Sequence, residues 1–179
     1  HGDDRRQRQM CIRDSDIEAI KKKVMRGLSE PAGIITFPGV NGYTKELDAR
    51  LPYDVDAAKK LLADAGYPNG FDVELRCPND RYVNDEAICT AVVGMLGKIG
   101  VNVNLFAQTK SKHFKELKDD QGDFYMLGWG VPTLDSHYVF HYLYESGASW
   151  NKVNFSNSEV DAAIRVMEGE VDLNKRNAA

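Results

Sequence analysis

Apolar residues recur with helical spacing in several stretches of the chain. The clearest stretch is 84–99, where the apolar positions from Ile88 to Ile99 fall at offsets 0, 3, 4, 7, 8 and 11. A second stretch, 54–65, carries a single apolar stripe, as expected for a helix with one buried face. Four more stretches are expected to be helical: 16–27, 112–117, 135–145 and 158–167.

Short polar residues stand where these helices are expected to begin. Asp16, Asp54 and Asn84 each precede an apolar stripe, and a serine or asparagine opens the last helix. Such a side chain accepts a hydrogen bond from a free N–H of the first turn, so we expect each one to act as an N-cap. Gly100 marks the end of the strongest helix.

Three short segments have the pattern of strands. Segments 71–75 and 101–105 alternate apolar and polar residues, and Phe124–Leu127 is a short apolar run rich in aromatic residues. A strand, a helix and a strand in succession predict a right-handed βαβ unit with parallel strands. The expected fold class is therefore α/β.

Composition narrows the class of protein. The 179 residues are 42% apolar and 28% charged, with a net charge of −4, as in an ordinary globular domain with a core. The absence of a basic block beyond the N-terminus argues against nucleic acid as a partner. No apolar run approaches the ~18–20 residues that a membrane-spanning helix needs.

The three cysteines, Cys11, Cys77 and Cys89, show neither a CxxC motif nor metal-ligand spacing. The sequence therefore implies no disulfide framework. Cys77 falls at a strand end and Cys89 within a helix, and both are expected to be small buried residues.

Residues 1–15 differ from the rest of the chain. They contain four arginines, few apolar residues and no periodicity. A basic arm that binds nucleic acid is one interpretation. We expect instead a non-native or disordered segment, because RRQRQMCIRDS resembles translated sequencing-adapter read-through. The folded part is then 16–179.

Trp129 stands between Gly128 and Gly130, just beyond the last expected strand. Its small neighbours leave the indole able to offer a flat apolar face and one N–H donor. Open α/β sheets bind ligands just beyond strand ends, so Trp129 is a candidate ligand-binding residue. The alternative is an ordinary core tryptophan.

Arg81 lies between a strand end and a helix start. Its planar guanidinium can hold a carboxylate through two parallel hydrogen bonds, and the nearby helix N-terminus favours an anion. The alternatives are a solvated surface arginine, or an ion pair with Asp80 or Asp85.

His137, His141 and Glu145 are spaced i, i+4 and i+8, so on a helix they share one face. Such a face can bind zinc. Tyr138 follows His137, so the glutamate of an HExxH metalloprotease is absent. Packing and a polar stripe also explain the stretch, and we expect no metal ligands.

Four blocks of the sequence, taken together, resemble the peptide-binding family of ABC-importer solute receptors. The blocks are Tyr53–Phe71, Pro78–Asp85, Leu96–Leu105 and Asp123–Gly130. The resemblance runs from about Asp16 to the end of the chain. It implies one lobe of a two-lobed periplasmic-binding-protein-like fold, in which helices flank a mixed sheet. The lobe is expected to be partial, truncated at both ends.

The resemblance also implies roles for particular residues. In dipeptide-binding relatives the arginine matching Arg81 takes the C-terminal carboxylate of the ligand, and the tryptophan matching Trp129 packs beside it. Peptide-binding members pair the α-amino group with an aspartate three residues after that tryptophan, where this chain has Pro132. Asp135 is the nearest acid downstream, with an N-cap role as its alternative. The expected ligand-binding residues are Arg81, Tyr82, Trp129, Gly130 and Asp135.

The function implied is that of a non-enzymatic, extracytoplasmic receptor that delivers a peptide or related small solute to the permease subunits of an ABC importer. Such a receptor is expected to be a monomer without a cofactor. It would be periplasmic, or lipid-anchored on the outer face of the cytoplasmic membrane, with its signal peptide outside this sequence. The alternative function is a metal-dependent hydrolase built on His137, His141 and Glu145.

Overall fold

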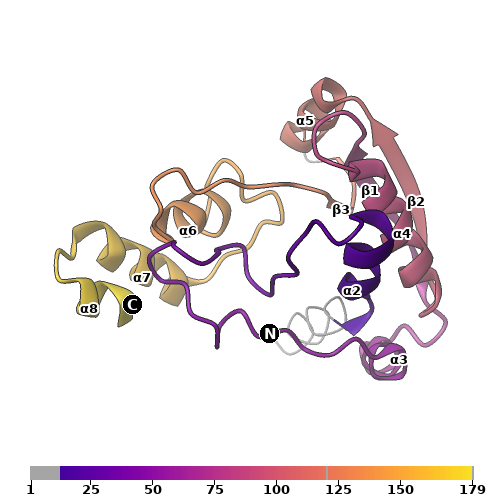
Figure 1. Cartoon of the computed structure of the whole chain (residues 1–179), viewed down its shortest axis with the longest axis horizontal. Coiled ribbons are helices and arrows are strands. Elements are labelled where there is room, and N and C mark those ends of the chain that lie inside the picture. Colours follow the sequence, from indigo (N-terminus) through magenta and orange to yellow (C-terminus); the bar gives the residue numbers. More distant parts are fainter. Residues whose placement is uncertain (1–12, 120, 179) are drawn as a thin grey trace. The chain divides into compact units, whose positions relative to one another are not determined.

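The computed structural model describes residues 13–119 and 121–178, which belong to two compact units (Figure 1). Unit 1 consists of His1–Pro31 and Arg50–Leu127, and unit 2 of Ala32–Ala49 and Gly128–Ala179. Most of the segment expected to be non-native, Cys11 included, lies outside the described residues, so that expectation stays a prediction.

Unit 1 is built on a parallel sheet of three strands, β1 (Phe71–Pro78), β2 (Val101–Gln108) and β3 (Phe124–Tyr125). Their order is β2-β1-β3, and β1 pairs with β2 along its whole length. The α/β class and the parallel pairing of the first two strands are confirmed. The expectation of a mixed sheet is corrected, because all the strands described in this unit run parallel.

The helices of unit 1 lie in the expected stretches. Helix α4 runs alongside β1 and β2 (Figure 1), and five buried apolar residues fill the main core: Ala58, Leu62, Leu96, Ile99 and Val101. The helical elements are α2 (Ile17–Ala19), which continues into the π-helical turn η1 (Ile20–Val24), α3 (Val55–Asp64), α4 (Asp85–Gly97) and α5 (Lys110–Lys118).

Two of the three N-caps predicted in unit 1 are confirmed. Asp16 accepts a hydrogen bond from the backbone N–H of Ala19 at 2.8 Å, and Asp54 accepts one from Ala57 at 2.9 Å. The prediction for Asn84 was wrong. Its φ is 57°, and its side-chain amide donates to the Val24 carbonyl at 3.0 Å. Asparagine tolerates this left-handed conformation, which directs its side chain away from the first turn of α4.

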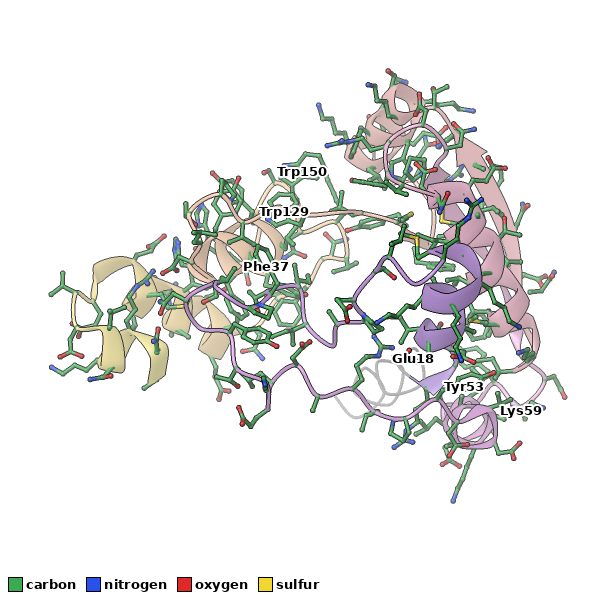
Figure 2. The ribbon with its side chains drawn as sticks, viewed as in Figure 1. Glu18, Phe37, Tyr53, Lys59, Trp129 and Trp150 are labelled. Carbon is green, nitrogen blue, oxygen red and sulfur yellow. A yellow bond between two sulfur atoms is a disulfide. The ribbon has the colours of Figure 1, made fainter. Side chains whose placement is uncertain are left out.

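A disulfide joins Cys77, at the end of β1, to Cys89 in the second turn of α4. Figure 2 shows the bond in yellow. The two Cα atoms lie 6.6 Å apart, within the usual range for a disulfide. The prediction of unpaired small buried cysteines is therefore corrected in part, since both residues are buried but bonded. A sequence separation of 12 residues gives no hint that the strand end will meet the helix.

The turns that enter β1 and β2 come into close backbone contact. Gly70 has a φ of 76°, and a Cβ at this position would lie 1.7 Å from the carbonyl oxygen of Gly100. Only glycine allows both the left-handed backbone and the close approach. These two glycines therefore allow β1 and β2 to start in register.

Unit 2 contains three helices, α6 (His137–Leu143), α7 (Ser158–Gly169) and α8 (Leu173–Ala178). Asn157 caps α7 by accepting from the N–H groups of Glu159 and Val160, as the sequence predicted. The core of this unit is formed by three buried valines, Val40, Val131 and Val139. Within the residues placed in the structure, we find no helix whose length and apolar character would suit a membrane span.

Candidate functional site

The carboxyl edge of the sheet in unit 1 has the geometry of a binding site. The chain leaves the central strand β1 for β2 on one side, and later returns to β3 on the other side. The loops after β1 and β3 therefore diverge at the same edge. Ligands of open α/β sheets bind at such a point of reversal. The loop after β1 carries Arg81 and Tyr82.

Asp85 holds the loop that carries these two residues. Its Oδ2 accepts hydrogen bonds from the backbone N–H groups of Arg81 and Tyr82, both at 2.9 Å, and its Oδ1 accepts from Glu86 at 2.9 Å. Burial raises the pKa of this carboxyl, but the backbone donors outweigh burial and leave the pKa lowered. Asp85 therefore stays ionised and fixes the backbone on which Arg81 sits. Asp85 thus holds the backbone of the loop and is not the ion-pair partner of Arg81 that the sequence offered as an alternative.

The Arg81 side chain is exposed, and its guanidinium carbon lies 5.1 Å from the centre of the Tyr82 ring. Neither acidic neighbour pairs with it. Asp85 accepts from backbone donors, and Asp80 accepts from the N–H of Lys110 at 2.5 Å, at the start of α5. Among the residues described, the Arg81 guanidinium has no carboxylate partner, which leaves its hydrogen-bonding edge for a ligand.

The segment that follows β3 is held by His113 of α5. This imidazole is fully buried, and its Nε2 lies 3.0 Å from the carbonyl oxygen of Met126. Burial lowers the pKa of His113, so at neutral pH the ring is uncharged and donates from Nε2. His113 therefore anchors the chain just before it leaves unit 1 at Leu127.

Trp129 belongs to unit 2, where it forms an aromatic cluster with Tyr138, Tyr142 and Trp150. Figure 2 labels the two tryptophans of this cluster. The ring centroids of these neighbours lie 6.0, 6.0 and 5.9 Å from the indole. The indole is half-buried, which agrees with the packing role that the sequence left open. Its Nε1 is buried and has no hydrogen-bond partner among the described residues, so one donor remains for a ligand acceptor.

Gly130 is exposed, with no atom of another residue near the position that a Cβ would take. Asp135 is fully engaged. Arg176 donates to both of its carboxylate oxygens, Asn41 donates to Oδ2, and the N–H of His137 donates to Oδ1. The Arg176 hydrogen bonds are the main reason why the pKa of Asp135 falls to about 2. Its role toward a ligand stays a prediction.

The histidines expected on one helix face do lie together, but with a different acid. His137, His141 and Glu168 place one ligand atom each within 4.8 Å of one another. Glu145, the acid predicted from the sequence, contacts only His141, at 2.8 Å. Glu168 lies on α7, and its meeting with α6 is a tertiary contact that spacing along one helix cannot reveal.

A cavity of about 730 Å³ opens in unit 2 between segment 32–36 and helices α6, α7 and α8. Its lining is mostly apolar, with Phe140, Tyr144 and Met167 among its residues. None of the five predicted ligand-binding residues lines it. We therefore do not assign the ligand to this cavity.

The fold and the loop at the carboxyl edge of the sheet define a class, the solute-binding α/β proteins. The match is specific: the family model described as "Bacterial extracellular solute-binding proteins, family 5 Middle" covers residues 15–151. The chain belongs to this family.

Two solved structures share the fold over 97% of the chain, each at 26% sequence identity. One is AgaA from A. tumefaciens in complex with agropinic acid, with a TM-score of 0.86 over 36% of that protein. The other is a dipeptide-binding protein from a Pseudoalteromonas species in complex with Met-Leu, with a TM-score of 0.84 over 35% of that protein.

Curated relatives include the heme-binding protein A of Haemophilus influenzae and the dipeptide-binding protein of Escherichia coli, each 28% identical. The matches cover 90% and 86% of this chain, but 30% and 29% of those proteins. The chain thus spans about 30% of the length of these relatives. All are named as binding proteins, and the comparisons give no support to the metal-dependent hydrolase considered as the alternative.

Proposed function

We propose that the chain is part of an extracytoplasmic receptor that binds a peptide or related small solute and delivers it to the permease subunits of an ABC importer. The observation that carries this proposal is Arg81, an exposed guanidinium without a carboxylate partner among the described residues, on a loop that Asp85 fixes at the carboxyl edge of the sheet. The receptor acts as a monomer, either periplasmic or lipid-anchored outside the cytoplasmic membrane.

The ligand has a carboxylate that Arg81 binds through two hydrogen bonds. Two relatives support this chemistry: AgaA is in complex with agropinic acid, and the Pseudoalteromonas protein with the dipeptide Met-Leu. Either ligand offers an acid group. A bidentate charged pair of this kind also selects against neutral ligands, because an unpaired arginine in a closed site loses its hydration.

A free α-amino group is not required. Pro132 stands where peptide-binding relatives are expected to have an aspartate, and it supplies neither charge nor N–H. Asp135, the nearest acid downstream, already binds Arg176. An ammonium left unpaired in a closed site would cost on the order of several kcal/mol. N-acylated peptides or non-peptide acids therefore suit the site better than ordinary dipeptides.

Calorimetry on the full-length receptor that contains this chain tests the proposal with pairs of peptides that differ only at the C-terminus, one a free acid and one an amide. Arg81→Ala should weaken binding of the acid by roughly 10- to 100-fold, the value of one or two charged hydrogen bonds, and leave the amide nearly unchanged. Arg81→Lys should recover part of the loss, since it keeps the charge but not the planar geometry.

An equal loss for acid and amide would show that Arg81 serves the fold and not the ligand. The second pair of peptides compares a free N-terminus with an acetylated one. A preference of about a hundredfold or more for the free amine, equivalent to ~2.7 kcal/mol, would contradict the proposed ligand class.

A further inference from the structure

The side chains of helix α6 (His137–Leu143) contact different neighbours on each face of the helix. Tyr138 and Tyr142 face Trp129, Val139 is buried in the core of unit 2, and Phe140 lines the cavity. The remaining pair, His137 and His141, faces α7. The two imidazole rings stack with centroids 5.5 Å apart and an interplanar angle of 18°, so the ring planes are nearly parallel.

Both histidines direct a nitrogen at one carboxylate oxygen. Oε1 of Glu168 lies 3.4 Å from Nε2 of His137 and 3.7 Å from Nδ1 of His141. These two nitrogens are inaccessible to water, and neither has a hydrogen bond of acceptable direction to any described residue. Two buried ring nitrogens that converge on an acid without hydrogen-bonding to it are unusual, because buried polar atoms normally find partners.

Two of the three ligand-atom separations fit metal coordination, and the third, between the two histidine nitrogens, is at most 4.8 Å. With zinc bonds of about 2.0–2.1 Å, the edge of a tetrahedron between two ligand atoms is about 3.3–3.4 Å. The contacts of 3.4 and 3.7 Å between the ring nitrogens and the Glu168 oxygen are close to this edge. Two imidazoles and a carboxylate are also the ligand types that zinc takes in proteins.

We propose that His137, His141 and Glu168 bind a zinc ion or a similar divalent transition metal that fastens α6 to α7. The sequence predicted no metal ligands, and the proposal revises that expectation. Oε2 of Glu145 lies 2.8 Å from Nδ1 of His141, within reach of the fourth position after a small side-chain rotation. The metal takes the place of any proton on the two nitrogens.

This site has a binding role without catalysis and does not depend on the proposed receptor function. A bound metal would also restrict the motion of the aromatic cluster around Trp129. Because Tyr138 and Tyr142 each directly follow one of the two histidines on α6, an ion that fixes the histidines also fixes the face that packs on Trp129.

The test titrates Zn²⁺ alone into the metal-stripped 179-residue chain at pH 7.5 by calorimetry, with near-UV circular dichroism to compare the folding of each variant. Wild type should bind one ion per chain. His137→Gln and Glu168→Gln should each weaken binding at least tenfold. Glu159→Gln is the matched control, because this exposed glutamate lies on the same helix α7, in its first turn, and outside the cluster.

Cobalt supplies a second readout. Co²⁺ bound by these ligands in a tetrahedral site should give intense visible absorption in wild type and in Glu159→Gln, and lose it in Glu168→Gln. Zinc should also raise the melting temperature of wild type and not that of Glu168→Gln. The proposal is overturned if wild type binds no zinc, or if binding and the cobalt spectrum persist unchanged in both His137→Gln and Glu168→Gln.

Discussion

Asp135 has four hydrogen-bond donors around one carboxylate. Arg176, Asn41 and the backbone N–H of His137 supply them, so the residue ties α8 and segment 32–49 to the start of α6. The side chain of Asp135 is 20% exposed and that of Arg176 is 18% exposed, so water screens the pair only partly. Asp135 is therefore expected to contribute measurably to the stability of unit 2.

Asp135→Asn should lower the free energy of unfolding by about 2 kcal/mol at pH 7, because the pKa falls from an ordinary value of ~3.9 to about 2 in the folded chain. Because the pKa of Asp135 is lower in the folded chain, the ionised carboxylate stabilises the fold at any pH above the pKa of the group in the unfolded chain. This stabilisation is lost as the pH falls toward the folded-state pKa of about 2. The difference between wild type and variant should therefore shrink between roughly pH 5 and pH 2.

Urea unfolding across this pH range measures the effect. Glu159→Gln is a suitable control in the same unit and should change the free energy by no more than about 0.5 kcal/mol at any pH. A variant as stable as wild type at pH 7 would show that the four hydrogen bonds of Asp135 are no stronger than the hydrogen bonds that its carboxylate makes to water in the unfolded chain.

At the scale of single residues, the sequence could reveal what depends on immediate neighbours. Asp16, Asp54 and Asn157 were predictable as caps because a cap needs only the next two or three residues. Asn84 was not predictable in this way, since its contact is the carbonyl of Val24, far away in the sequence. The partners of Asp80 and Asp135 are likewise set by tertiary contacts.

At the scale of elements, the disulfide fastens the central strand to the helix that follows it. Cys77 ends β1 and Cys89 lies in α4, so the covalent loop contains the whole segment that carries Arg81. Disulfides are typical of proteins outside the cytoplasm, which agrees with the extracellular family.

Replacing both cysteines by alanine should lower the free energy of unfolding by about 3 kcal/mol, the loop-closure value for a loop of this length. The measurement is denaturant unfolding of both proteins with and without a reducing agent. The reductant should remove most of the difference, because reduced wild type also loses the cross-link. A difference that is just as large under reducing conditions would assign the effect to packing instead.

The sequence could predict most elements of unit 1, because amphipathic spacing is a local property. It missed the last three residues of β1 and β2, where Arg76 and Gln108 interrupt the apolar pattern but still pair in the ladder. In unit 2 the sequence placed α6 correctly but could not assign its faces. Every face of that helix has a neighbour, so no single apolar stripe marks the buried side. Glu168 was missed because it lies on α7, and its contact with α6 cannot be read from the spacing along one helix.

At the scale of the whole molecule, the chain consists of two units and spans about 30% of the length of the heme-binding and dipeptide-binding relatives. A ligand site normally buries ~70–90% of a small ligand, with contacts from more than one wall. We therefore expect the present chain to supply only part of such an enclosure.

The isolated 179-residue chain should therefore bind a carboxylate-bearing ligand at least about a hundredfold more weakly than the full-length receptor does. Calorimetry with the same ligand on both proteins measures the ratio. Equal affinities would mean that this chain alone holds the complete site, and would remove the need for contacts from elsewhere in the receptor.

Both tryptophans of the chain, Trp129 and Trp150, belong to the aromatic cluster of unit 2, with ring centroids 5.9 Å apart. Indoles this close exchange excitation energy, and the adjacent tyrosines transfer theirs to the pair. The tryptophan emission of the chain therefore originates in unit 2, and unit 1 contributes only the emission of its tyrosines. Fluorescence excited selectively at the indoles is thus a label-free reporter of unit 2, and an indole probe for unit 1 has to be introduced.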